Sequence, residues 1–246
     1  MLSWKDKYPN EINIRNLYLD DSWKELFLNL FENKKFIIIE KFINKHKNNI
    51  TIFPYPDYLW NSFNMTPMHN IKSIIISQDP YIGKHEDIPQ AMGIAFSVQE
   101  SIPFPSSLQN IFKNMIKFGH IDQMPESGDL SYLSNQGCLL INSSLTVFEK
   151  QAGSHMKIWE WFTDEIIKYL SDKFENIIFV LWGAFAVGKL KYIDENKHNI
   201  IISSHPSGLS CNKALKQYPS FNNNDHFGQI NEYLIKNGKS PLKYKK

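Results

Sequence analysis

The sequence predicts an α/β fold in which helices flank a central four-stranded parallel sheet. Two observations support this class: four short apolar runs rich in β-branched residues follow one another from residue 71 onward, and amphipathic stretches separate them. Continuous apolar runs suit strands that are buried on both faces, and strands that alternate with helices indicate a parallel sheet. At 246 residues the chain can bury a substantial core, and we expect a single domain over residues 1–246.

The N-terminal part, about residues 1–65, is expected to be mainly helical. Residues 21–36, DSWKELFLNLFENKKF, combine a capping Asp or Ser with apolar residues at helical spacing. Residues 52–63, IFPYPDYLWNSF, suggest a segment broken by proline and then a short helix. The remainder, about residues 66–246, is the predicted α/β core.

Within this core, strands and helices are expected to alternate. The predicted strands are residues 71–77, 137–143, 176–182 and 198–204, and the predicted helices are about 106–118, 157–173, 184–195 and 226–237. Ligands of such sheets bind at the carboxyl ends of the strands. The residues that follow each strand are therefore the first candidates for a functional site.

Chemically different side chains stand at the ends of the four strands or directly after them. In chain order they are Gln78-Asp79-Pro80-Tyr81, Asn142, Gly183 and His205. Taken singly, an Asn at a strand end is more often a structural amide, and a lone His is more often a capped core residue. Because all four strand ends converge on one rim, the acid, the amide, the glycine turn and the histidine together predict a site.

Several function classes are disfavoured. The chain has no GxxxxGK[ST], GxGxxG or GxSxG motif, which argues against nucleotide sites and a hydrolase triad. Its eight histidines are scattered and its two cysteines lack metal-ligand spacing, so we expect free thiols, no metal and no cofactor. No signal peptide or membrane span is recognisable, and we expect an intracellular protein, cytoplasmic or nuclear. A net charge of +2 permits nucleic-acid binding only through a local basic patch.

The residues at the rim suit the cleavage of a base from a sugar. A carboxylate can orient water or stabilise a developing cation, and a histidine can stabilise a developing oxyanion. An asparagine presents a donor and an acceptor side by side, which matches a base edge. The aromatic rings of Tyr81 and Phe96 offer stacking faces. Breaking an N-glycosidic bond needs this set, because the base leaves as an anion, the sugar becomes cationic and water attacks.

In these motifs the chain resembles the family 1 uracil-DNA glycosylases. The matching segments stand in the family's order and approximate spacing: QDPYIG, QAMGIAFSV, FPSSL, GDLSYLSNQGCLLINSSLTV, SHMKIWEWFTD, FVLWGAFA and HPSGLS. The resemblance extends from about residue 20 to the C-terminus. It implies a single glycosylase-like domain of base-excision repair that flips uracil out of DNA, hydrolyses its N-glycosidic bond and leaves an abasic site.

The resemblance also implies roles for individual residues. Asp79 would position the water and stabilise the cationic sugar, and His205, kept neutral, would bond the uracil oxygen that gains charge. Asn142 would read the base edge and reject cytosine, while Tyr81 would crowd C5 and exclude the methyl group of thymine. Phe96 would stack on the base.

The remaining implied contacts concern the pocket wall and DNA. Gln78 would line the uracil pocket through its main chain. On the DNA side, Ser107 and Ser207 would hold phosphates near the flipped nucleotide, and Gly183 would also contact DNA. Leu209 would be the wedge that enters the duplex. The implied partner is uracil-containing DNA, single- or double-stranded. A protein inhibitor of uracil glycosylases and replication proteins are further candidate partners, and a monomer is expected.

The sequence departs from the family pattern mainly on the DNA side. Ile82 replaces the usual histidine after Asp-Pro-Tyr, Met92 replaces a second histidine, Ala184 replaces a serine and Gly208 replaces a proline. Insertions lie at about 84–89 and 214–224. We therefore expect uracil excision with an altered grip on DNA.

Three further expectations remain open at this stage. One alternative is a glycosylase-like adaptor for DNA or replication proteins. Two features motivate it: the reduced number of expected side-chain contacts with DNA, and the insertions. Another is a glycosylase with a shifted base choice, which the presence of Asn142 and Tyr81 disfavours. The lysine-rich segment 239–246 is expected to be solvated, with weak attraction to DNA as the alternative.

Overall fold

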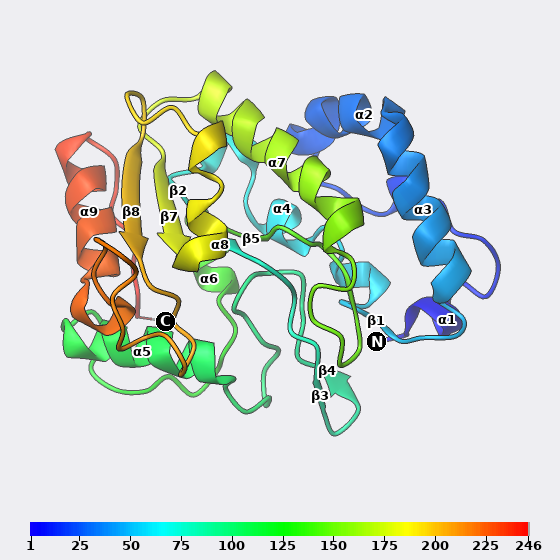
Figure 1. Ribbon diagram of the computed structural model, residues 1–246, viewed down its shortest axis with the longest axis horizontal. Coiled ribbons are helices and arrows are strands. Elements are labelled where there is room, and N and C mark those ends of the chain that lie inside the picture. The colour runs from blue at the N-terminus through cyan, green and yellow to red at the C-terminus, as the bar shows by residue number, and fades with distance from the viewer. Residues whose placement is uncertain (246) are drawn as a thin grey trace.

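The computed structural model describes residues 1–245 and is built around a four-stranded parallel sheet (Figure 1). In spatial order the strands are β5 (Cys138–Asn142), β2 (Ser73–Ser77), β7 (Ile178–Trp182) and β8 (Asn199–Ser203). The register brings the strand ends level, since Ser77 lies opposite Asn142 and Trp182 lies opposite Ser203. The predicted fold class and the four predicted strands are confirmed.

Each face of the sheet carries its own hydrophobic cluster. Ile74 and Ile76 of β2 pack against helices α2 (Lys24–Glu32), α3 (Lys34–His46) and α7 (Met156–Lys173). Ile75 points to the opposite face, as the period of a strand requires, and packs with α5 (Ser106–Lys117) and α9 (His226–Lys236). β2, β5 and β7 are buried on both faces, although β5 lies at one edge of the sheet; β8, at the other edge, is only partly buried.

Two predicted helices are interrupted in the structure. The stretch 21–36 is divided at Asn33, whose backbone is extended and whose side chain caps α3 by accepting a bond from the Lys35 N–H. The stretch 184–195 becomes the short α8 (Gly183–Val187), which ends at Gly188, and a 3₁₀ turn. Apolar spacing continues across both breaks, so periodicity alone does not reveal them.

The other elements are short. They are helices α1 (Trp4–Lys7), α4 (Asn61–Met65) and α6 (Ser131–Ser134), strands β1 (Ile52–Phe53), β6 (Val147–Phe148), β3 (Lys84–His85) and β4 (Ile88–Pro89), and 3₁₀ turns Ile14–Asn16, Asp21–Trp23, Pro56–Tyr58, Met68–Asn70, Leu190–Tyr192 and Phe221–Asn223. Across residues 1–245 no helix has the length and apolar character needed to cross a bilayer. In the same part of the chain, no three His, Cys, Asp or Glu side chains gather as metal ligands would.

Both insertions form small local structures. Residues 84–89 form the hairpin β3–β4, and its turn residues Glu86 and Asp87 have φ values of 46° and 65°. Positive φ at both turn positions matches the twist of a tight hairpin. In the second insertion, Leu215 and Tyr218 exchange two backbone hydrogen bonds.

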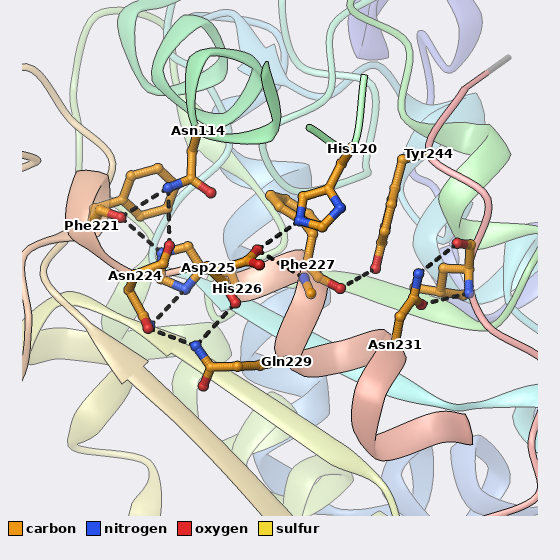
Figure 2. Close-up of polar contacts among 12 residues, drawn as sticks. Asn114, His120, Phe221, Asn224, Asp225, His226, Phe227, Gln229, Asn231 and Tyr244 are labelled. Atoms are coloured by element: carbon orange, nitrogen blue, oxygen red, sulfur yellow. Dashed lines mark hydrogen bonds and ion pairs between the residues drawn. The ribbon is translucent and has the colours of Figure 1, made fainter. Parts of the chain in front are cut away.

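The C-terminal segment is docked, contrary to the expectation that it is solvated. Leu242 and Tyr244 are buried in the cluster formed with α5 and α9. The side chain of Asn231 exchanges two hydrogen bonds with the backbone of Leu242, and the Tyr244 hydroxyl donates to the carbonyl of Phe227 (Figure 2). The expectation was wrong because the apolar residues alternate with lysines and turn inward. Lys246 lies outside the described residues.

Candidate active site

A cavity of about 260 Å³ opens where the strands end. In Figure 1 the arrows of β7 and β8 point toward this edge, where α5 and α8 lie. Seven of the predicted site residues line the cavity: Gln78, Asp79, Tyr81, Phe96, Ser107, Asn142 and His205. The other three, Gly183, Ser207 and Leu209, do not. Segment 91–94 and Ala152 complete much of the wall, and sequence reasoning had not placed them there.

The two oxygens of the Asp79 carboxylate have different surroundings. Oδ2 accepts hydrogen bonds from the backbone N–H of Gly153 at 3.1 Å and from Nε2 of Gln78 at 3.0 Å. Oδ1 is buried and has no hydrogen-bond partner within residues 1–245. Burial raises the pKa of Asp79, and the two hydrogen bonds oppose that change. One oxygen is thus held in place while the other is available to a water or ligand.

Gly153 is a contributor that the sequence reasoning missed. It has a φ of 75° in the loop between β6 and α7, a conformation that favours glycine. The sequence shows a glycine at this position, between a predicted strand and a predicted helix. It does not show that the glycine N–H contacts the Asp79 carboxylate, because that contact joins positions 74 residues apart.

The surroundings of His205 favour the neutral imidazole and one tautomer of it. Its Nδ1 accepts the backbone N–H of Ser207 at 3.1 Å, so the proton of the neutral ring is on Nε2. Burial lowers the pKa of His205 below its ordinary value of 6.5. Gly183 lies directly behind the ring: a Cβ there would come within 2.9 Å of the His205 Cβ, and its φ is 88°. Gly183 thus supports the position of His205 and does not itself face the cavity.

Asn142 ends β5 with its side chain at the cavity. It is buried, and its Oδ1 lacks a hydrogen-bond partner among the described residues. A buried amide oxygen without a partner costs about 1–3 kcal/mol. Such a group beside a cavity is suited to receive a donor from a bound molecule.

Tyr81 and Phe96 form one rigid unit. The Tyr81 hydroxyl donates to the backbone carbonyl of Phe96 at 3.1 Å, and burial raises the pKa of Tyr81. Phe96 has a φ of 64°, which is strained for an aromatic residue and typical of functional sites. The centroid of its ring lies 5.5 Å from that of Trp182, in an edge-on contact, and 5.9 Å from that of His205.

The departures from the family pattern have structural explanations at two positions. Ile82 packs in a small apolar cluster with Phe53, Ala91 and Val147, so an apolar residue suits that site. Met92 is buried, and its Sδ accepts a hydrogen bond from Ser97 at 3.0 Å. Leu209 is 85% exposed.

Comparisons with known proteins agree with this geometry. The model of the uracil DNA glycosylase superfamily matches residues 63–235. A uracil-DNA glycosylase of Phocaeicola vulgatus is 42% identical over 230 residues, which cover 93% of this chain and all of the relative. A probable uracil-DNA glycosylase of Acanthamoeba polyphaga mimivirus is 37% identical over 98% of this chain and 69% of its own length. The crystal structure of mimivirus uracil-DNA glycosylase superposes with a TM-score of 0.94 at 37% identity, covering 99% of this chain and 93% of that one.

Proposed function

This chain belongs to the uracil-DNA glycosylase superfamily and hydrolyses the N-glycosidic bond of uracil in DNA, and we propose that the side chains at the cavity divide that reaction among them. The enzyme is a monofunctional glycosylase of base-excision repair, which releases free uracil and leaves an abasic site. The target nucleotide leaves the base stack to reach the cavity, which costs a few kcal/mol in a duplex.

Asp79 is the proposed water-positioning group. Its Oδ1 would accept a hydrogen bond from the attacking water and take up a proton as the new bond to C1′ of the sugar forms. The electron pair of the broken C1′–N1 bond leaves with uracil. The ionised carboxylate would also stabilise the positive charge on the sugar. The held Oδ2 and the open Oδ1 support this division of roles.

His205 is the proposed hydrogen-bond donor to the uracil oxygen on which negative charge develops. The Ser207 N–H occupies Nδ1, so Nε2–H is the only donor that the neutral ring offers. A donor held ready in a buried site stabilises developing charge without reorganisation. The lowered pKa keeps the ring neutral at pH 7.

Asn142, Tyr81 and Phe96 are the proposed determinants of base choice. The open Oδ1 of Asn142 would accept the imide N3–H of uracil, while its amide N–H would donate to the adjacent carbonyl. Cytosine presents an acceptor and a donor at those positions and would meet like groups. The rigid Tyr81 ring would exclude a methyl group at C5, and Phe96 would stack on the base. Gln78 would line the pocket.

The proposed contacts with the DNA backbone and duplex come from residues at the outer edge of the cavity. Ser107, near the N-terminus of α5, would hold a phosphate, helped by the N–H groups of the first helical turn. Ser207 and Gly183 would lie along the strand, and the exposed Leu209 would fill the space left in the duplex. We propose that the protein acts as a monomer on single- and double-stranded DNA.

The observation that carries this assignment is that Asp79 Oδ1 and Asn142 Oδ1, two buried oxygens with no hydrogen-bond partner within residues 1–245, lie at one cavity with His205. The test is release of free uracil from a uracil-containing oligonucleotide by the wild type and by Asp79→Asn. Asp172→Asn, an exposed acid on α7, is the matched control and should behave as wild type. Full release by Asp79→Asn, or none by the wild type at high enzyme concentration, would contradict the assignment.

The proposed protein partner is UGI, a protein inhibitor of uracil-DNA glycosylases. A mimivirus UNG variant solved in complex with UGI superposes on this chain with a TM-score of 0.94 at 38% identity. We expect UGI added to the uracil-release assay to abolish activity in proportion to its concentration. Undiminished release at excess UGI would remove it as a partner.

A further inference from the structure

A second hollow lies at the opposite edge of the sheet from the catalytic cavity. It has a volume of about 860 Å³ and is lined by residues just before β2, residues just before β5 and the C-terminal segment. The sheet strands are parallel, so they all run from this edge toward the catalytic one. A five-residue strand spans about 16 Å. A molecule in this hollow would therefore not meet the flipped nucleotide.

The hollow concentrates positive charge. Four of its lining residues are lysines (Lys72, Lys239, Lys243 and Lys245), and none of the twelve is Asp or Glu. Lys245 pairs with Asp122 at 2.6 Å. The other three have no carboxylate partner within residues 1–245: Lys72 Nζ bonds Ser240, and Lys239 Nζ donates to the carbonyl of Asn176.

The charge of Lys72 acts on Lys239 in this hollow. Burial lowers the pKa of Lys72, and burial together with the charge of Lys72 lowers the pKa of Lys239. An anion between them would offset both the repulsion and the partial loss of water.

The lysines are presented on a fixed support. Gln136 exchanges two hydrogen bonds with the backbone of Lys243, at 2.9 and 2.7 Å. Asn231 holds Leu242 in the same way, and the Tyr244 hydroxyl is bonded to the Phe227 carbonyl (Figure 2). A prearranged row of charges loses little conformational entropy when it binds a ligand.

We propose that this lysine groove (Lys72, Lys239 and Lys243) binds an acidic peptide segment of a partner protein while DNA occupies the catalytic edge. Carboxylates along a peptide complement its three cations, which have no carboxylate partner in the described part of the chain. A nucleic-acid strand is a poorer fit, because binding of single strands relies on aromatic stacking faces. Among the described residues of the lining, only Tyr132 and His69 carry aromatic rings, and the Tyr132 hydroxyl donates to the Tyr244 carbonyl.

The test uses a fluorescein-labelled poly-glutamate peptide and a poly-glutamine peptide of equal length, measured by fluorescence anisotropy with the full chain. The triple variant Lys72→Gln, Lys239→Gln, Lys243→Gln removes the charges but keeps amide donors for the backbone carbonyls. Its matched control removes the same charge from exposed lysines of α3: Lys34→Gln, Lys41→Gln, Lys45→Gln. Lys243→Gln alone covers the case in which the triple variant does not fold, because that side chain is exposed.

We expect the wild type and the α3 control to bind poly-glutamate, the groove variant to bind about tenfold more weakly, and Lys243→Gln to fall between them. Saturating abasic duplex should leave peptide binding unchanged, and uracil release by the groove variant should equal that of the wild type. Equal binding by the groove and control variants would overturn the proposal. So would displacement of the peptide by a uracil-free oligonucleotide that itself loses affinity for the groove variant, since the groove would then be a nucleic-acid site.

Discussion

The side-chain amide of Asn110 on α5 donates a 2.7 Å hydrogen bond to the backbone carbonyl of Pro206. Pro206 directly follows His205 and precedes the exposed Leu209 in the same loop. One turn earlier on α5, Ser106 Oγ accepts the N–H of Gly208 at 3.4 Å. Helix α5 therefore positions the loop that carries both the imidazole of His205 and the proposed wedge.

Asn110→Ala should weaken excision from duplex DNA more than from single strands, because only a duplex needs the wedge. The loss in kcat/KM on duplex should reach about tenfold at most, since a neutral hydrogen bond contributes about 0.5–1.5 kcal/mol. The control Asn237→Ala removes a similar amide-to-carbonyl bond, from Asn237 to Tyr233 at the end of α9, and should have no effect. Equal losses on both substrates would show that the bond does not act through the wedge.

Gln78→Leu should move the acid limb of the pH–kcat/KM profile to higher pH. The Gln78 amide donates to the Asp79 carboxylate and so favours its ionised form, and its removal raises the pKa of Asp79 further above 3.8. We expect a shift of less than about one pH unit, since Gln78 is exposed and such bonds contribute at most about 1 kcal/mol. An unchanged limb with a lower plateau would instead indicate a contact with substrate.

His205 should titrate below pH 6.5 and carry its proton on Nε2 when neutral. Nitrogen NMR of the imidazole in the free enzyme checks both statements. Because its pKa lies below 6.5, the ring is neutral above about pH 7.5, and kcat/KM should be flat from there to about pH 8 as far as this residue is concerned. A protonated ring at pH 7, or a proton on Nδ1, would contradict the donor role.

Tyr81→Ala should permit slow release of thymine, because it removes the ring proposed to exclude the C5 methyl group. Tyr81→Phe is the control: it keeps the ring and loses only the hydroxyl bond to Phe96, so it should remain selective for uracil. The measurement is the ratio of thymine to uracil released from matched oligonucleotides. Thymine release by both variants would point to the Phe96 support, not the ring, as the determinant.

Gly208→Ala should stabilise the protein by about 0.4–1 kcal/mol and improve excision from duplex DNA, because it restricts the wedge loop. Gly208 lacks a left-handed φ, and the nearest atom to an added Cβ is Ser106 Oγ at 3.8 Å. Gly119→Ala is the contrasting variant. Gly119 has a φ of 76°, which alanine rarely adopts, so this substitution should destabilise the protein. Thermal unfolding and duplex kcat/KM together test the prediction, and a loss of both in Gly208→Ala would refute it.

The strand ends could be predicted because they are encoded locally. An apolar run such as residues 71–77 predicts a buried strand. The polar residue at its carboxyl end must then lie where the strands of the sheet end. Asp79, Asn142 and His205 were found in this way, and the structure brings all three to one cavity. The break at Asn33 was missed because an extended, capping residue leaves the apolar period unchanged, and the end of α8 at Gly188 leaves the period unchanged as well.

The sequence by itself determined the fold class, the strands and the set of chemical groups at their ends, because each depends on residue type and on spacing within a few positions. Only the tertiary structure decided which oxygen of Asp79 is open, which nitrogen of His205 carries the proton, and that lysines of the C-terminal segment join Lys72 in one groove. These features depend on contacts with Gly153, the Ser207 N–H and Ser240, whose directions follow from how the backbone packs. Residue spacing carries no information about those directions.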